Sequence, residues 1–114
     1  MEQAIPINRL KQALIVSFQV DLSLSLLATF EMTLLSRLSE EGIKGVLIDL
    51  SGLKTCGCDE LMGLLALAKA VEMMGRHCVF VGLRPGLVMG MLDVGMDTSE
   101  MVSVASLEQG MELL

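Results

Sequence analysis

The chain is poor in aromatic side chains. Its 114 residues include no Trp, no Tyr and only 3 Phe, although 53% of them are hydrophobic. Because aromatic side chains are so few, a folded core must be built from Leu, Val, Ile, Met and Ala. The chain also has 10 Met, a residue that fills irregular gaps in cores and lines adaptable binding surfaces. We therefore expect a mainly aliphatic core, with Met89 and Met96 as candidates for an exposed Met-rich surface.

Clusters of basic residues are also missing. Lys and Arg number 8 against 14 Asp and Glu, which gives a net charge of −6. Contacts with phosphate groups need clustered Lys and Arg, so the composition argues against binding to nucleic acid or to an anionic membrane. Apolar stretches such as residues 61–68 are far too short to span a bilayer. No secretory signal is predicted at the N-terminus, and we expect a cytoplasmic protein.

Residues that hold metals or cofactors are few. The 3 Cys stand at positions 56, 58 and 78, and the 1 His is His77. An odd number of Cys without a secretory signal does not indicate a disulfide framework. A C-x-C pair with one His lacks the fourth ligand of a structural zinc site, and neither common glycine-rich phosphate motif of enzymes occurs. The sequence therefore predicts no metal and no cofactor.

The sequence also lacks a recognisable pair of catalytic residues. His77 opens a predicted strand, whereas Cys58 follows a different strand. In a parallel sheet these positions fall at opposite ends, so a Cys–His pair is not expected. A thiol-redox site at Cys56 and Cys58 stays open, although redox motifs usually read C-x-x-C. We expect no catalytic residues and no enzymatic activity.

Strand and helix patterns alternate along the chain. Strands are predicted at residues 5–10, 13–18, 45–50, 78–81 and 101–104, and helices at about 23–41, at 59–74, after Pro85, and from Ser106 onward. Asp21, Ser23 or Ser25 is a candidate cap for the first helix, and Ser106 with Gln109 forms a predicted capping box. Gly42, Gly75 and Gly95 are predicted to end the first three helices.

This order, β-β-α-β-α-β-α-β-α, predicts an α/β fold. Strands that alternate with helices form a mostly parallel sheet with right-handed crossovers, and the helices pack on it. Pro6 confines the first strand to an edge, which we expect to be antiparallel to its neighbour. No linker or repeat stands out, so we expect a single domain over residues 1–114.

One strand-loop-helix segment concentrates the candidate site residues. The apolar run at 45–50 contains Asp49, a Gly-rich loop follows, and the next helix opens with Asp59 and Glu60. Backbone N–H groups at such a helix start can hold an anion. We expect Asp49 to accept N–H groups of the loop at 51–58 and so to hold its shape. The turn at 82–86, which contains Arg84, is either a plain turn or a second anion site.

Several segments together resemble the STAS domain, the fold of the anti-sigma factor antagonists. They are IPI-x-RL at 5–10, ALIVSFQ with Gln19 at 13–19, GVLIDLSGL at 45–53, MMG at 73–75 and VFVGLRPG at 79–86. The resemblance runs from about Ile5 to Leu113, and within the family it is to the RsbS type of stressosome scaffold protein. It implies a non-enzymatic role in stress signalling and binding to related STAS proteins of the RsbR co-antagonist type.

The resemblance also implies a phosphorylation switch in the loop. In this family a partner serine kinase of the RsbT type phosphorylates a Ser or Thr at the head of the helix. Aligned from Asp49, that position falls on Cys58 and its acidic neighbour on Gly57. The implied partner-binding residues are Asp49, Ser51, Thr55, Gly57, Cys58, Asp59, Leu61 and Met62.

The departure at Cys58 puts the switch itself in question. Ser51 and Thr55 are the nearest hydroxyls. Asp59 lies roughly 100° further around the helix and is a poor phosphate mimic.

The function that the resemblance implies is a stressosome scaffold or anti-sigma factor antagonist that forms homo- or hetero-oligomers. Three alternatives stay open. They are a monomeric anti-sigma factor antagonist, a thiol-based redox sensor that uses Cys58, and a STAS module that binds a small ligand.

Overall fold

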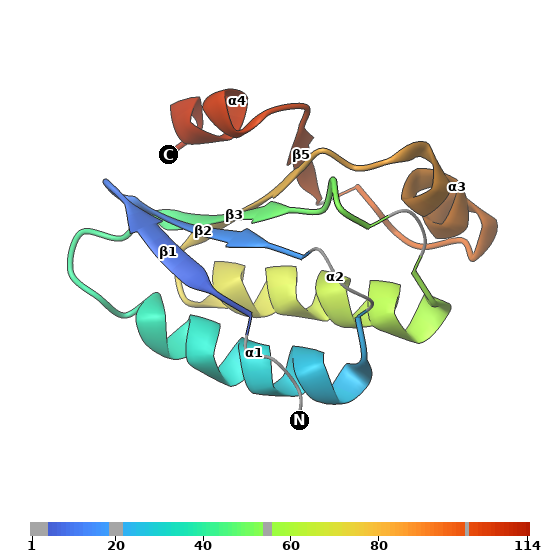
Figure 1. The fold of residues 1–114 in the computed structure, drawn as a ribbon, viewed down its shortest axis with the longest axis horizontal. Helices are drawn as coiled ribbons and strands as arrows, with labels where there is room; N and C mark the ends of the chain where they lie inside the picture. Colours follow the sequence, from blue (N-terminus) through green and yellow to red (C-terminus); the bar gives the residue numbers. More distant parts are fainter. Residues whose placement is uncertain (1–4, 19–21, 54–55, 100) are drawn as a thin grey trace.

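A computed structural model describes residues 5–18, 22–53, 56–99 and 101–114. The elements follow one another in the predicted order, which confirms the α/β class (Figure 1). They are β1 (Ile7–Leu10), β2 (Ala13–Ser17), α1 (Leu24–Arg37), β3 (Gly45–Asp49), α2 (Cys58–Met73), β4 (His77–Val81), α3 (Pro85–Asp93), β5 (Val102–Val104) and α4 (Leu107–Glu112).

The strands form one mixed sheet in the order β1-β2-β3-β4-β5. β1 pairs antiparallel with β2, as predicted for the edge, and the other three pairs are parallel. Gly45 of β3 is in register with His77 of β4, and Asp49 is in register with Val81. The loops that follow β3 and β4 therefore leave the sheet at the same edge, which is formed by the carboxyl ends of the parallel strands. His77 lies at the opposite edge, where these strands begin.

Helices cover both faces of the sheet. α1 and α2 lie on one face and α4 lies on the other (Figure 1). The larger core cluster contains Leu, Val and Ile side chains together with Phe18, Phe30 and Phe80, and a smaller cluster of Leu47, Val79 and Val81 lies under α4. The Phe18 and Phe30 rings meet edge to face, with centroids 5.1 Å apart. The predicted aliphatic core is confirmed.

The methionines divide between core and surface. Met89 is 58% exposed, as expected. Met96 is 9% exposed and packs in the larger core cluster, so its assignment to the surface was wrong. Its backbone N–H donates to the carbonyl of Met91 at the end of α3, and this turn directs the side chain inward.

The end of the first helix differs from the prediction. α1 stops at Arg37 with Leu38 as its C-cap, several residues before the expected end near 41. Gly42, with φ +81°, lies in the following turn into β3 and is not the C′ residue of the helix. Gly75 and Gly95 do follow the C-caps of α2 and α3 with positive φ, which confirms those two helix ends.

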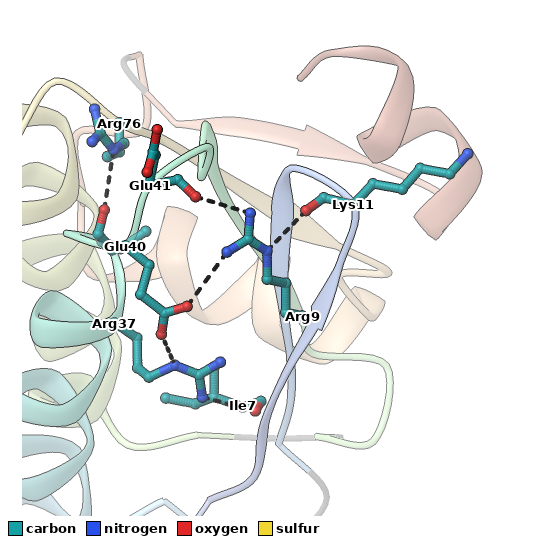
Figure 2. A network of polar contacts seen from close by, with 8 residues as sticks. Ile7, Arg9, Lys11, Arg37, Glu40, Glu41 and Arg76 are labelled. Carbon is teal, nitrogen blue, oxygen red and sulfur yellow. Dashed lines mark hydrogen bonds and ion pairs between the residues drawn. The ribbon is translucent and has the colours of Figure 1, made fainter.

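A polar network surrounds this turn (Figure 2). The Glu40 carboxylate accepts a hydrogen bond from Arg37 and lies 3.5 Å from the Arg9 guanidinium. Arg37 also donates to the carbonyl of Ile7 at 3.2 Å, and Arg9 donates to the carbonyl of Glu41 at 3.0 Å. Single exposed pairs contribute little, but together these contacts join the β1–β2 hairpin to the end of α1.

Two helices have side-chain N-caps at the predicted residues. Ser23 accepts a hydrogen bond from the Leu26 N–H at 3.1 Å, whereas the alternative cap Asp21 lies outside the described residues. Ser106 accepts from the Gln109 N–H at 3.2 Å. The Gln109 side chain accepts in turn from the Ala105 N–H at 2.9 Å. In a standard capping box the donor would be the N–H of the N-cap residue itself, Ser106.

Candidate functional site

The candidate site is built from two loops at one edge of the sheet. The loop after β3 leads into α2, and the loop after β4 leads into α3. The strand ends hold both loops, because Leu50 N–H donates to the Val81 carbonyl at 2.9 Å and Gly82 N–H donates to the Val104 carbonyl at 3.0 Å. In open parallel sheets this edge is where loops form binding sites.

Asp49 connects the strand to its loop. Its carboxylate accepts a hydrogen bond from the Ser51 N–H at 2.9 Å, which agrees with the expected local role of Asp49. The Ser51 carbonyl accepts in turn from the Arg84 guanidinium at 3.2 Å, across 33 positions of the sequence. Arg84, expected in either a plain turn or an anion site, has a backbone partner in the neighbouring loop.

Gly82 allows the two loops to approach each other. Its φ of +70° is rarely adopted by other residues. A Cβ atom at this position would lie 3.0 Å from the Cβ of Ser51 and 3.5 Å from the Asp49 carboxylate. Sequence reasoning missed this residue. Glycine directly after a buried strand was the only signal for it.

The start of α2 carries the positions implied by the family resemblance. Gly57 is the N-cap residue and offers no side-chain hydrogen bond, while its carbonyl accepts from the Leu61 N–H at 2.9 Å. Cys58 is the first residue of the helix and is exposed, and α2 therefore begins one residue earlier than predicted. Asp59 and Glu60 follow in the first turn, where negative charge complements the helix dipole.

Glu60 folds back toward the N-cap. A Cβ atom added to Gly57 would overlap the Glu60 carboxylate. The helix start, which we expected to be open to an anion, therefore already has a carboxylate of the chain beside it. Glu60 was expected only to open the helix, although acidic residues at the third helical position often reach back in this way.

The three cysteines lie in different environments. Cys58 is exposed, Cys56 is half-buried against the larger core cluster, and Cys78 is buried in β4. Burial raises the pKa of the Cys56 thiol, and the nearby Glu60 carboxylate raises it further, while a backbone contact with Gly57 works in the opposite direction. Burial, with a smaller effect from Glu72, raises the pKa of Cys78 to about 12.

The remaining predicted site residues are brought together only in part. Ser51, Gly57, Cys58, Asp59 and Met62 lie on the surface at this edge, whereas Leu61 is 2% exposed and packs in the core. Leu61 therefore cannot offer a partner its side chain without the helix moving. Thr55 lies outside the described residues, as does Gln19.

Catalytic and metal-binding groups do not converge at this site. His77 is exposed at the start of β4, at the edge of the sheet opposite Cys58. Within the described ranges, His, Cys, Asp and Glu side chains form no group of three that would hold a metal ion. No helix in the part of the chain described here is both long and apolar enough to cross a bilayer.

Comparison with known proteins identifies the family. A model of the STAS domain matches residues 4–104. This chain belongs to the STAS domain family. The RsbT co-antagonist protein RsbRA of Bacillus subtilis (strain 168) is 24% identical over 118 residues, a match that covers 96% of this STAS chain and 43% of RsbRA. The chain thus spans less than half the length of that relative. YezB of the same organism, an uncharacterized protein, is 30% identical over 76 residues, which cover 67% of this chain and 78% of YezB.

Solved structures share the STAS fold over nearly the whole chain. A serine-to-glutamate variant of RsbS from Moorella thermoacetica has a TM-score of 0.80 at 21% identity and covers 97% of this chain and 94% of its own. A chain from the structure of the stressosome, described as a signal integration and transduction hub, has a TM-score of 0.78 at 21% identity. The match covers 95% of this chain and 94% of the stressosome chain. The resemblance to the STAS domain stated from the sequence is therefore confirmed.

Proposed function

We propose that this STAS protein is a non-enzymatic anti-sigma factor antagonist of the stressosome scaffold type. It binds related STAS proteins of the RsbR co-antagonist type and a serine kinase of the RsbT type. The observation that carries the proposal is the combination of a complete STAS fold with an RsbS and a stressosome chain among its structural neighbours. RsbRA, one of the sequence relatives, supports the choice of partner class.

The arrangement of the site supports binding rather than catalysis. The Arg84–Ser51 hydrogen bond and the close approach at Gly82 join the two loops, and Asp49 holds Ser51 within its own loop. This arrangement supports a preformed surface for a partner. The single His77 lies at the far edge of the sheet, so no imidazole stands beside Cys58 to act as its base. Nucleophilic catalysis needs a base within hydrogen-bond reach of the nucleophile.

The kinase-facing surface contains Ser51, Gly57 and the exposed start of α2. Met62 is 48% exposed one turn into the helix, and Met89 and Leu92 of α3 add apolar surface. α2 and α3 are in contact, since a Cβ atom on Gly90 would lie 3.6 Å from the Leu61 side chain. An adaptable apolar surface beside acidic residues suits protein partners better than nucleic acid.

In this proposal Cys58 occupies the phosphoacceptor position. The thiol does not serve as the acceptor in an ordinary Ser/Thr kinase reaction. Because phosphorylation adds up to about two negative charges to a contact surface, a chain that escapes it keeps its partner-binding surface at all times. Partner binding is then constitutive.

Affinity purification of the full chain from its host, with identification of partners by mass spectrometry, tests the proposal. We expect a related STAS protein and a serine kinase among the retained proteins. Met62→Glu should weaken kinase binding by roughly tenfold or more, because it places a charge in an apolar contact. Met32→Glu is the matched control, since Met32 is an exposed Met of α1, 77% accessible. If neither partner class is retained, or if both variants bind the kinase alike, the proposal fails.

A further inference from the structure

The end of the loop before α2 and the first residue of that helix carry two thiols of contrasting exposure, two positions apart. Cys58 is open to solvent, and Cys56, two residues earlier, is half-buried with its side chain against the core. Small oxidants in solution reach the exposed thiol first. The third thiol, Cys78, is 3% exposed on β4 and serves as an internal reference within the same molecule.

The residue between the two thiols is glycine. Gly57 has an extended conformation, with φ −67° and ψ 158°. Cα atoms two residues apart lie roughly 5.5–7 Å from each other, depending on the central residue, and disulfides span about 4.4–6.8 Å. A modest compaction at Gly57 brings the pair into this range, and glycine permits the backbone change at the lowest cost.

We infer that Cys56 and Cys58 form a reversible disulfide when the protein meets a peroxide. The Cys58 thiolate attacks one peroxide oxygen, the O–O bond breaks, and hydroxide leaves as water after taking up a proton. Cys58 is then a sulfenic acid. The Cys56 sulfur attacks the Cys58 sulfur, the S–O bond breaks, and the departing hydroxide takes the Cys56 proton to form a second water. Two thiols lose two electrons, and the peroxide gains them.

The position favours a reversible bond over a structural one. A ring closed over a single intervening residue is strained, and strained or exposed disulfides are the ones that thiols reduce readily. Closure withdraws Cys56 from its core contacts and changes the N-cap conformation at Gly57. The first turn of α2 should therefore loosen. An effect on kinase binding would rest on the proposed function, whereas the disulfide itself does not.

The test uses the full chain, hydrogen peroxide as the oxidant, N-ethylmaleimide to block remaining thiols, and tryptic peptide mass spectrometry. Trypsin cleaves after Lys54, Lys69 and Arg76, so Cys56 and Cys58 share one peptide and Cys78 falls in another. We expect the first peptide to lose the mass of two hydrogen atoms and to escape N-ethylmaleimide. Dithiothreitol should restore both thiols, and Cys78 should stay reduced throughout.

Two single variants assign the roles of the two thiols. In Cys56→Ser, peroxide should leave a sulfenic acid on Cys58 that dimedone traps. In Cys58→Ser, Cys56 should remain a free thiol over the same time, which is a complete loss of oxidation. The inference is overturned if the wild-type protein forms only Cys58–Cys58 links between chains, if Cys58 proceeds to the sulfinic acid while Cys56 stays free, or if neither thiol is oxidised.

Discussion

At the scale of single residues, the proposed phosphoacceptor position differs from a serine by one atom. Cys58 has sulfur where a serine would have oxygen, at the exposed first position of α2. In the proposed alignment its neighbour Gly57 stands where the family resemblance implies an acidic residue. The structure adds a reason why glycine suits this place, because the Glu60 carboxylate occupies the space that a larger side chain would need.

Restoring both residues should restore the reaction. We expect Gly57→Asp together with Cys58→Ser to gain one phosphate from an RsbT-type kinase and ATP, measured by intact mass, and Cys58→Ser alone to gain less. The Glu60 side chain is flexible and can move aside for the new Asp, but two carboxylates would then lie close together. Adding Glu60→Gln should therefore raise the yield. A triple variant that takes up no phosphate would contradict the alignment that places the acceptor at position 58.

Cys78 gives a prediction for alkaline pH. Burial raises its pKa in the folded protein to about 12, from 9.0 for an ordinary cysteine. The folded state therefore keeps a proton that the unfolded state loses, so stability falls as the pH rises above 9.

Titration of Cys78 should lower the free energy of unfolding by up to about 1.4 kcal/mol for each pH unit in this range. Urea unfolding between pH 9 and 11 should show this loss in the wild-type protein and a shallower one in Cys78→Ala. Equal slopes in the two proteins would show that Cys78 titrates normally in the fold.

At the scale of secondary-structure elements, most of the fold was predictable because local patterns and tertiary packing agree. The helical spacing of Leu64, Ala68 and Val71 matches the buried face of α2, and the apolar run at 45–50 gave β3. The end of α1 was not predictable. The residues just beyond it contact Arg9, which is far away in the sequence, and such contacts leave no local pattern.

The site was predictable only where its contacts join residues that are close in the sequence. The Asp49–Ser51 contact spans two positions and follows from the ordinary behaviour of Asp before a turn. The contact of Arg84 with Ser51 and the close approach at Gly82 depend on the pairing of two strands. The burial of Leu61 likewise follows from the way α2 lies on the sheet, which spacing near a helix start does not fix.

Two glycines offer a matched test of how the loops are held. Gly82→Ala should destabilise the protein by about 1–2 kcal/mol, because alanine is strained at positive φ and its Cβ would crowd Ser51. Gly90→Ala, inside α3 with ordinary space around it, should stabilise by about 0.5–1 kcal/mol. Thermal or urea unfolding measures both. A neutral Gly82→Ala would mean that the two loops are less tightly joined than the structure shows.

At the scale of the whole molecule, the exposed apolar side chains favour association. Leu24, Met62, Met89, Leu92 and Leu113 are all exposed by about half or more, on a small acidic chain. We expect light scattering after size-exclusion chromatography to give a mass above that of one 12.3 kDa chain, alone or with a co-expressed STAS co-antagonist. A single 12.3 kDa species at high concentration in both samples would favour the monomeric antagonist instead.

The most direct test of the central claim combines binding and phosphate transfer in one sample. The wild-type chain is mixed with an RsbT-type kinase and ATP, and the mixture is followed by size-exclusion chromatography and intact mass. We predict that the chain and the kinase elute together and that the chain gains no phosphate, because Cys58 is not an acceptor. Failure to bind the kinase would contradict the account, and so would a phosphate found on Ser51 or Thr55, since the switch would then have moved rather than been lost.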